Sequence, residues 1–227
     1  MKEACKRAAA ALGVTFVKDG DRVGLGTGST AQYLIELLGQ KVAQGLTVSC
    51  VASSEATRAL AEEAGLDVGD LPADGRLDIT LDGADEVDPE LNLIKGGGGA
   101  LLREKVLAAA SDRVVIMVDS AKRVSRLGES FPVPIEVLPF AVSFVRKRLQ
   151  EVSPQAALRL VAGAPFVTDN GNWIVDCALP TQVDVVSLAG RLAAVPGIVE
   201  HGLFVALATE VIVAEAPDRV RVMRAAH

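Results

Sequence analysis

The first half of the sequence alternates short apolar stretches with segments of helical periodicity, and this alternation limits the fold more than any other feature. Apolar stretches bounded by turn residues predict strands at residues 22–25, 46–51, 77–81 and 113–118. Segments of helical periodicity predict helices at residues 2–17, 29–43, 54–64 and 100–110. Repeated β-α-β units predict a parallel sheet flanked by helices, an α/β fold whose ligands bind beyond the carboxyl ends of the strands.

The alternation changes after the segment Phe131-Pro-Val-Pro134. From there we expect the order β-α-β-β-α-β, at residues 133–138, 141–151, 157–161, 173–177, 185–195 and 198–204. This order is typical of a ferredoxin-like α+β domain. The segment Asp169-Asn-Gly-Asn172 predicts the turn between the two middle strands, because Asn and Gly tolerate positive φ.

A last apolar run, at residues 210–214, is expected to return to the large sheet. The smaller domain would then be an insertion in the larger one rather than a tail. The sequence therefore predicts a large domain at 1–130 and 205–227 and an inserted domain at 131–204.

Composition and charge exclude several classes of protein. The 227 residues carry a net charge of -6 and no Lys/Arg-rich tract, so nucleic acid is not expected as a partner. No apolar run approaches the roughly 18 residues of a membrane span, and the first residues lack a signal peptide's layout, so we expect a cytoplasmic protein with no membrane partner. Three cysteines, far apart and without a CxxC pair, indicate neither a disulfide framework nor a zinc site.

Histidine is scarce in this sequence. Only two are present, and one of them is the last residue, His227. A Ser-His-Asp triad or a multi-histidine metal site would therefore depend on His201 alone. We expect acid and base chemistry from carboxylates and lysines instead.

Glycines punctuate the segment Gly24 to Thr30, between a predicted strand and a predicted helix. Glycines let backbone amides approach an anion, and the helix N-terminus adds about half a unit of positive charge. Thr27, Ser29 and Thr30 add hydroxyl donors, so the pattern favours a phosphate cradle. It is neither a P-loop, since no Lys follows the last glycine, nor the dinucleotide fingerprint, because the third glycine does not have the spacing of that motif. The alternative is a Gly-rich turn capped by Ser29 or Thr30.

Four acidic residues crowd the segment Leu81 to Asp88. Carboxylates this close repel one another unless solvent, a cation or a ligand with many hydroxyl groups lies among them. Asp82 and Asp85 are separated by two small residues and are candidates to face one pocket and accept hydrogen bonds from a polyol. The alternatives are a helix N-cap with a turn at Asp88-Pro89, and a Mg²⁺ site.

Four consecutive glycines, Gly96 to Gly99, follow Lys95 and precede a predicted helix. Such a run carries an entropic penalty, which favours a role in the close approach of backbone to a ligand. Lys95 can meet a negative oxygen, and Glu104, about one helical turn beyond the loop, can point at the same cavity. For Glu104 the alternative is an exposed carboxylate on the helix surface, paired with Lys105 or Arg103.

Together, the three clusters are expected to place a phosphate cradle, two polyol-binding carboxylates, an electrophilic lysine and a glutamate around one pocket. Those are the parts of an aldose–ketose isomerase. A carboxylate removes the proton α to the carbonyl and returns it to the neighbouring carbon, while a cation or hydrogen-bond donors stabilise the ene-diolate oxygen. Lys122, after the fourth predicted strand, is expected on the same rim. This chemistry requires no redox cofactor.

At these residues the sequence resembles the type A family of ribose-5-phosphate isomerases, over essentially its whole length. Three motifs in the same order carry the resemblance: Gly26-Thr-Gly-Ser-Thr30, Asp82-Gly-Ala-Asp85 and Lys95-Gly-Gly-Gly98. The resemblance implies interconversion of D-ribose 5-phosphate and D-ribulose 5-phosphate, in the non-oxidative pentose phosphate pathway, by a cytoplasmic homodimer without metal. It also implies a Rossmann-like catalytic domain with the smaller ferredoxin-like domain predicted above.

The resemblance also implies roles for individual residues. The glutamate matching Glu104 is the proton acceptor in that family. Within that frame, Lys95 stabilises the developing oxyanion, while Asp82 and Asp85 hold sugar hydroxyls and assist ring opening. The residues expected to bind substrate are Thr27, Gly28, Ser29, Thr30, Asp82, Gly83, Ala84, Asp85, Lys95, Gly96, Gly97, Gly98 and Lys122.

Other functions remain open at this point. A related sugar-phosphate deaminase or lactonase is one, although such reactions often recruit a catalytic histidine, which is scarce here. A sugar-phosphate sensor is another, but it needs a DNA-binding or signalling surface, and the sequence contains no helix-turn-helix extension or basic segment. A coenzyme-A-transferase-like fold is a third, distinguished by a covalent thioester at Glu104 during turnover.

Overall fold

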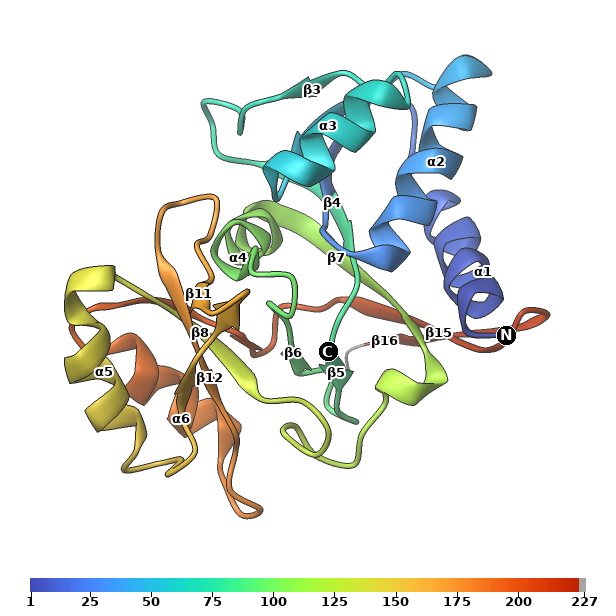
Figure 1. The fold of residues 1–227 in the computed structure, drawn as a ribbon. Helices are drawn as coiled ribbons and strands as arrows, with labels where there is room; N and C mark the ends of the chain where they lie inside the picture. The colour runs from blue at the N-terminus through green and yellow to red at the C-terminus, as the bar shows by residue number, and fades with distance from the viewer. Residues whose placement is uncertain (225–227) are drawn as a thin grey trace. The chain divides into compact units, whose positions relative to one another are not determined.

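The structure, a computed structural model, describes residues 1–224 (Figure 1). The chain divides into two compact units. The first unit comprises Met1–Ala84, Arg103–Arg123 and the chain from Ala206 onward. The second comprises Asp85–Leu102 and Val124–Val205.

A seven-stranded sheet forms the centre of the first unit, in the order β16-β15-β7-β4-β1-β2-β3. Neighbouring strands are parallel except β15 and β16, which pair in antiparallel fashion. Strands β7 and β15 are buried over most of their length, as expected of strands covered on both faces. In chain order the strands are β1 (Arg22–Leu25), β2 (Ser49–Ala52), β3 (Val68–Gly69), β4 (Leu77–Asp82), β7 (Ser111–Asp119), β15 (Glu210–Ala216) and β16 (Arg219–Arg224).

Helices cover both faces of this sheet: α1 (Lys2–Val14), α2 (Ser29–Ala43), α3 (Glu55–Glu63) and α4 (Leu101–Ala110). Helix α1 packs beside α2 and against β7 and β15, and its Gly13 leaves room for the side chains of Leu81 and Met117. The carbonyl of Leu107 in α4 accepts a hydrogen bond from Thr80 Oγ1 (3.3 Å). Successive strand residues point to opposite faces, so Leu81 and Thr80 place α1 and α4 on opposite sides of the sheet.

The second unit contains a four-stranded antiparallel sheet in the order β13-β8-β12-β9. Its strands are β8 (Val133–Val137), β9 (Ala157–Leu158), β12 (Trp173–Cys177) and β13 (Ile198–His201). Helices α5 (Val142–Leu149) and α6 (Val185–Ala193) share an apolar core with alternate residues of these strands. The chain order β8-α5-β9-β12-α6-β13 with this strand order is the ferredoxin-like pattern.

Two smaller sheets belong to the second unit. One contains β14 (Leu203–Phe204), β6 (Leu93–Ile94) and β5 (Glu86–Val87), and the other pairs β10 (Leu160–Val161) with β11 (Ala164–Pro165). All of these pairings are antiparallel. The loop that follows β6 contains the four consecutive glycines, so this small sheet determines where that loop begins.

The predicted fold class, α/β with a parallel sheet flanked by helices and a smaller ferredoxin-like part, is confirmed. Strand β15 pairs with β7, which confirms that the last apolar run returns to the large sheet. The single strand predicted at 198–204 is wrong. The chain leaves β8 and pairs with β6 after Gly202, where a Cβ would lie 2.3 Å from Lys95 O. The strand predicted at 157–161 likewise divides, at Arg159, into β9 and β10.

The two compact units differ from the expected domain boundaries. Residues 85–102, 124–130 and 205, which the sequence prediction assigned to the large domain, belong to the second unit. The short strands β5 and β6 in the first of these segments pair with β14 of the same unit, which accounts for the difference. The Rossmann-like domain at 1–130 and 205–227 and the ferredoxin-like domain at 131–204 stay a prediction.

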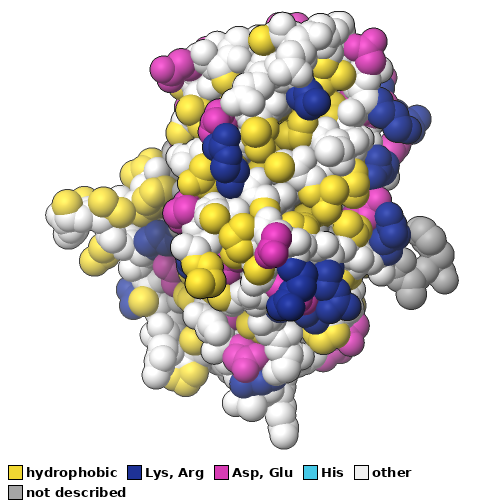
Figure 2. All heavy atoms as spheres, turned by 90° about the vertical axis from the view of Figure 1, so that its right-hand side faces the viewer, with side chains coloured by type: hydrophobic (Ala, Val, Ile, Leu, Met, Phe, Trp, Pro, Cys, Tyr) yellow, Lys and Arg dark blue, Asp and Glu magenta, His cyan; other side chains and the backbone are white. Residues whose placement is uncertain are grey.

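The surface drawn in Figure 2 carries Lys and Arg side chains in small groups among Asp, Glu and apolar side chains. On that face the cations form no continuous basic field of the kind that binds a phosphate backbone. Separately, no helix within residues 1–224 is long and apolar enough to span a membrane.

Candidate active site

The segment Gly26 to Thr30 joins β1 to α2 in the first unit. Gly28 is the N-cap of α2 and has φ 124°, a conformation that glycine adopts without steric cost. Because Gly28 has no side chain to cap the helix, the first N–H groups of α2 and the positive end of its dipole remain available to an anion. A cap by Ser29 or Thr30 is wrong, since the helix already begins at Ser29.

Thr27 joins a cluster of hydroxyl groups at the ends of two neighbouring strands. Its Oγ1 lies 2.8 Å from Ser53 Oγ and 2.9 Å from Ser54 Oγ. Thr57 Oγ1 lies 3.0 Å from Thr27 Oγ1 and donates to Gly26 O (3.1 Å). The sequence prediction did not include Ser53 and Ser54, although they follow β2 directly, just as Gly26 and Thr27 follow β1.

Asp82 is the last residue of β4 and is buried. Its Oδ1 accepts a hydrogen bond from Gly83 N (2.7 Å). The carboxylate lies directly against Gly26, where an added Cβ would be 1.9 Å from Oδ1. The first predicted carboxylate and the predicted phosphate loop are therefore in contact.

Glu104 lies in the first turn of α4 and is only 4% exposed. The alternative of an exposed carboxylate is therefore wrong. Its neighbour Arg103 forms an ion pair with Glu55 (2.7 Å). Helix α4 ends at Ala110, next to the first residue of β7, so its C-terminus lies at the amino end of that strand. Glu104 is six residues before Ala110, or about 9 Å back along the helix axis, toward the carboxyl edge of the sheet.

Three of the predicted groups share the carboxyl edge of the large sheet. Strands β7, β4 and β1 are adjacent and parallel, so they end at the same edge. Lys122 follows β7 in a short 3-10 helix, η1 (Ser120–Lys122), Asp82 ends β4, and the segment Gly26 to Thr30 follows β1. Gly83 and Ala84 continue directly from Asp82. This is the edge at which parallel sheets bind ligands.

The remaining predicted residues, Asp85 and Lys95 to Gly98, belong to the second unit. Gly96 and Gly99 have φ of 99° and 83°, a left-handed conformation that explains the choice of glycine at both positions. The carboxylate of Asp85 accepts a hydrogen bond from Gly97 N through Oδ2 (2.8 Å). Asp85 therefore holds the glycine loop directly.

Lys95 is 3% exposed, which is rare for a lysine. Its Nζ lies 5.6 Å from the centroid of the Phe204 ring, in β14. The face of an aromatic ring attracts a cation, and the attraction grows when water is excluded. The Phe204 ring therefore stabilises a positive charge on Lys95.

The other two acidic residues of the crowded segment have structural roles. The carboxylate of Glu86 accepts hydrogen bonds from the backbone N–H groups of the loop at residues 128–131. Asp88 begins the turn between β5 and β6, and its carboxylate accepts from Asn92 N (2.8 Å) and Asn92 Nδ2 (3.1 Å). Burial raises the pKa of Asp88, and the bonds from Asn92 oppose that shift. The predicted turn at Asp88-Pro89 is confirmed, whereas the helix N-cap is wrong, because a strand follows.

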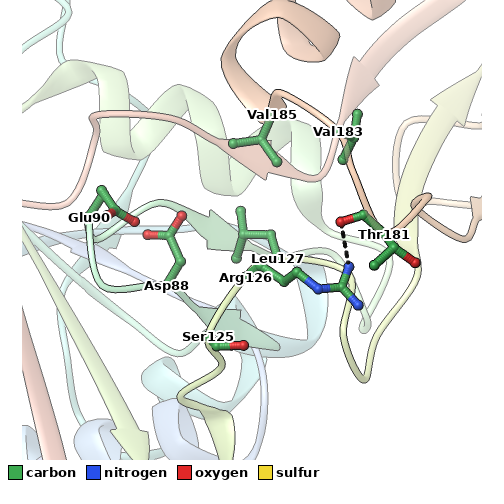
Figure 3. Close-up of a pocket in the computed structure, with 8 residues that line it drawn as sticks. All are labelled: Asp88, Glu90, Ser125, Arg126, Leu127, Thr181, Val183 and Val185. Carbon is green, nitrogen blue, oxygen red and sulfur yellow. Dashed lines mark hydrogen bonds between the residues drawn. The ribbon is translucent and has the colours of Figure 1, made fainter.

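A cavity of about 170 Å³ lies in the second unit (Figure 3). Figure 3 shows Arg126 directed at the carbonyl of Thr181, to which its Nη1 donates (3.2 Å). No predicted substrate-binding residue lines this cavity. Its lining is Asp88, Glu90, Ser125, Arg126, Leu127, Thr181, Val183 and Val185.

Within residues 1–224, no group of three or more His, Cys, Asp or Glu side chains is close enough together to hold a metal ion. A Mg²⁺ site at Asp82 and Asp85 would need only these two carboxylates, because Mg²⁺ keeps several of its waters, so that alternative stays a hypothesis.

Known proteins resemble this chain over nearly its whole length. A relative named ribose-5-phosphate isomerase A from Bradyrhizobium diazoefficiens is 52% identical over 220 residues, covering 92% of this chain and 91% of its own. One of the same name from Rhodopseudomonas palustris is 49% identical over 232 residues, covering 99% of each chain.

Solved structures agree in fold. The structure of a D-ribose-5-phosphate isomerase in complex with phospho-erythronic acid has a TM-score of 0.95 and 37% identity, with 99% of each chain covered. That of ribose 5-phosphate isomerase A from Methanocaldococcus jannaschii has a TM-score of 0.91 and 36% identity, with 97% of this chain and 98% of that one covered.

The family model described as ribose 5-phosphate isomerase A (phosphoriboisomerase A) matches residues 49–218. This match includes the ends of β2, β4 and β7 and the glycine loop, and the relatives extend the similarity over the segment Gly26 to Thr30. The chain therefore belongs to the ribose 5-phosphate isomerase A family.

Proposed function

We propose that this chain, which interconverts ribose 5-phosphate and ribulose 5-phosphate as a member of its family, does so without a metal ion and with Glu104 as the proton carrier. The observation that carries the assignment is the burial of Glu104 in the first turn of α4, 4% exposed. A carboxylate held away from bulk water passes a proton between substrate carbons with little loss to solvent.

The proton moves in two steps. Glu104 removes the proton from C2 of the open-chain aldose, whose carbonyl is at C1, and the electron pair left at C2 forms the ene-diolate. The carboxylic acid of Glu104 then returns the proton to C1, while the O2 hydroxyl proton passes to O1, so the carbonyl ends at C2. Atoms and electrons balance without an oxidant or a metal.

Lys95 stabilises the negative oxygen of the ene-diolate in this proposal. Its burial supports the role, because a positive charge acts more strongly on a developing oxyanion where water is excluded. The N–H groups of Gly96 and Gly98 belong to the same loop and supply donors to substrate oxygens, whereas the N–H of Gly97 holds the carboxylate of Asp85.

The carboxylates of Asp82 and Asp85 hold sugar hydroxyls and assist opening of the furanose ring. Both are positioned by backbone N–H groups, of Gly83 and Gly97 respectively, so each has a fixed orientation. Fixed acceptors lower the entropy that must be lost when the substrate reacts.

The segment Thr27 to Thr30 binds the phosphate in this proposal, with Lys122 as a supplementary cation. The free N-terminus of α2 and the position of Gly28 support this role, since the helix dipole favours an anion there. Gly83 and Ala84 add small residues beside Asp82, which allow a substrate to approach the backbone.

A cytoplasmic location and a homodimer are part of the same proposal. The three cysteines are free and buried, as suits a reducing compartment. Phe140, fully exposed, and Phe144, 48% exposed, support association with a second copy, because large apolar side chains rarely face water in a group. Light scattering after gel filtration is expected to give twice the 23.6 kDa of the chain, and a monomer mass at micromolar concentration would contradict the dimer.

The reaction is tested with ribose 5-phosphate and an excess of chelator, with ketose detected over time. We expect the same rate with and without chelator. Absence of ketose in both samples would contradict the isomerase, and loss of activity in the chelated sample alone would contradict the metal-free mechanism.

A further inference from the structure

Arg159 connects the glycine loop to the ferredoxin-like sheet of the second unit. It lies between β9 and β10, and its guanidinium pairs with the carboxylate of Asp176 in β12. Nε and Nη2 donate to the two different carboxylate oxygens, the bidentate geometry that fixes a guanidinium most firmly. The side chains of Arg159 and Asp176 are 15% and 25% exposed, so water competes little with this pair.

The third nitrogen of Arg159 contacts the loop itself. Nη1 donates to Gly96 O (3.2 Å) and to Gly97 O (3.0 Å). The planar guanidinium thus binds a strand of the sheet with one edge and two successive carbonyls of the loop with another. Lysine has no such arrangement of donors, because its ammonium is a single point.

Phe166 holds the same guanidinium and the same loop. Its ring centroid lies 5.8 Å from Arg159 Cζ, and its N–H donates to Arg159 O (2.9 Å). The ring also lies against Gly99, where an added Cβ would be 2.3 Å from Phe166 Cε1. The end of the loop is therefore packed against the side chain that stacks on Arg159.

Because the peptide bond is planar, these contacts fix the direction in which the N–H groups of the loop point. In a trans peptide the C=O and the following N–H point in opposite directions. With Gly96 O held by Arg159, the N–H of Gly97 points the other way, where it donates to Asp85 Oδ2. With Gly97 O held as well, the N–H of the exposed Gly98 also points away from Arg159.

We propose that Arg159 is a positioning residue for isomerisation, which orients the Gly97–Gly98 peptide so that the Gly98 N–H faces the reacting oxygens of the substrate. This rests on the proposed role of the loop in binding substrate. The carboxylate of Asp176 already neutralises the charge of Arg159. Arg159 therefore acts by fixing the direction of a peptide dipole in the loop, and not through its own charge. An N–H fixed before the reaction costs no reorganisation when the oxyanion forms.

The test compares Arg159→Ala and Arg159→Lys with the unaltered enzyme. We expect kcat to fall at least about tenfold in both, because the loop peptide loses its fixed direction. Guanidinium ion at a non-denaturing concentration is expected to restore part of the kcat of Arg159→Ala and none of that of Arg159→Lys, where the side chain still fills the site. Arg148→Ala is the matched control, since Arg148 also pairs with a carboxylate in this unit, Glu151.

Two inhibitors separate positioning from a general loss of structure. Phospho-erythronic acid carries a carboxylate that resembles the ene-diolate oxygens, whereas inorganic phosphate tests the phosphate site alone. We expect the alanine variant to bind phospho-erythronic acid about tenfold more weakly and to bind inorganic phosphate as the unaltered enzyme does.

Two results would overturn the proposal. One is a kcat close to that of the unaltered enzyme in the lysine variant, which keeps a cation beside Asp176 and so keeps the fold. The other is an equal loss of affinity for both inhibitors without rescue by guanidinium, which indicates a structural role only. Failure of Glu104 as the base is a separate result, because Glu104 is present in every one of these variants.

Discussion

The carboxylate of Asp82 occupies the space that any side chain on Gly26 would need. A Cβ on Gly26 would lie 1.9 Å from Asp82 Oδ1 and 2.0 Å from its Cγ, far inside the contact distance of two heavy atoms. Gly26 follows β1, and Asp82 ends the neighbouring parallel strand β4, so their contact joins the proposed phosphate loop to the proposed hydroxyl-binding carboxylate. The absence of a side chain at position 26 thus leaves room for the Asp82 carboxylate, in addition to the role proposed for this loop in binding phosphate.

Substitution of Gly26 by alanine is therefore expected to displace Asp82. We expect kcat/KM to fall about 100-fold in Gly26→Ala, because a displacement of about 1 Å in a positioning group has effects of that size. Steady-state kinetics with ribose 5-phosphate measures it. Gly69→Ala is the control, since a Cβ there meets no atom within 4 Å. Activity of the Gly26 variant within twofold of the control would contradict the account.

Glu86 is expected to stabilise the fold rather than to take part in the reaction. It is 1% exposed, and its carboxylate accepts hydrogen bonds from the N–H groups of Gly128, Ser130 and Phe131. In Glu86→Gln the new NH₂ group faces at least one of these donors, which leaves buried groups unsatisfied at a cost of about 2–3 kcal/mol.

Urea denaturation measures this loss in the free energy of unfolding. Glu90→Gln, at an exposed position in the adjoining turn, is the control and is expected to change stability by less than about 0.5 kcal/mol. Equal stability of the two variants would show that the carboxylate of Glu86 is dispensable.

Cys50 is expected to make the fold less stable in alkali. Burial raises the pKa of its thiol from 9.0 to about 12. Above pH 9.0 the unfolded chain loses the thiol proton while the folded chain keeps it, so the free energy of unfolding falls as pH rises from about 9 toward 12. The fall attributable to this group approaches about 1.4 kcal/mol per pH unit.

Denaturation of the protein and of Cys50→Ala, at several pH values between 8 and 10.5, isolates this contribution. We expect the difference in stability to shift in favour of the alanine variant as pH rises. Parallel curves for the two proteins would mean that the Cys50 thiol ionises equally well in the folded state.

Elements with a clear period were predictable from the sequence, and shorter ones were not. The bounds 29–43 match α2, because the helix follows a glycine that can adopt φ 124° and has a continuous apolar face. Strands β5 and β6 have two residues each, too few to show an alternation, and they exist because β14 pairs with β6. The extra strand β16 was missed because it alternates between exposed and half-buried residues without an apolar run.

For the candidate site, the sequence predicted which loops take part better than it predicted the burial and contacts of their side chains. The glycine clusters pointed to their loops, but nothing local distinguishes Glu104 from its charged neighbours Arg103 and Lys105. Its burial follows from packing alone. Arg159 gave no signal, because the carbonyls that it binds lie 62 and 63 positions earlier in the chain.

The central claim, that Glu104 carries the proton, is tested most directly by the turnover of Glu104→Gln. Glu63→Gln, at an exposed position of α3, is the matched control. With ribose 5-phosphate we expect kcat of the Glu104 variant to fall about 100-fold or more, the range for loss of a general base, while its affinity for phospho-erythronic acid is largely kept. A kcat equal to that of the Glu63 control would contradict the account.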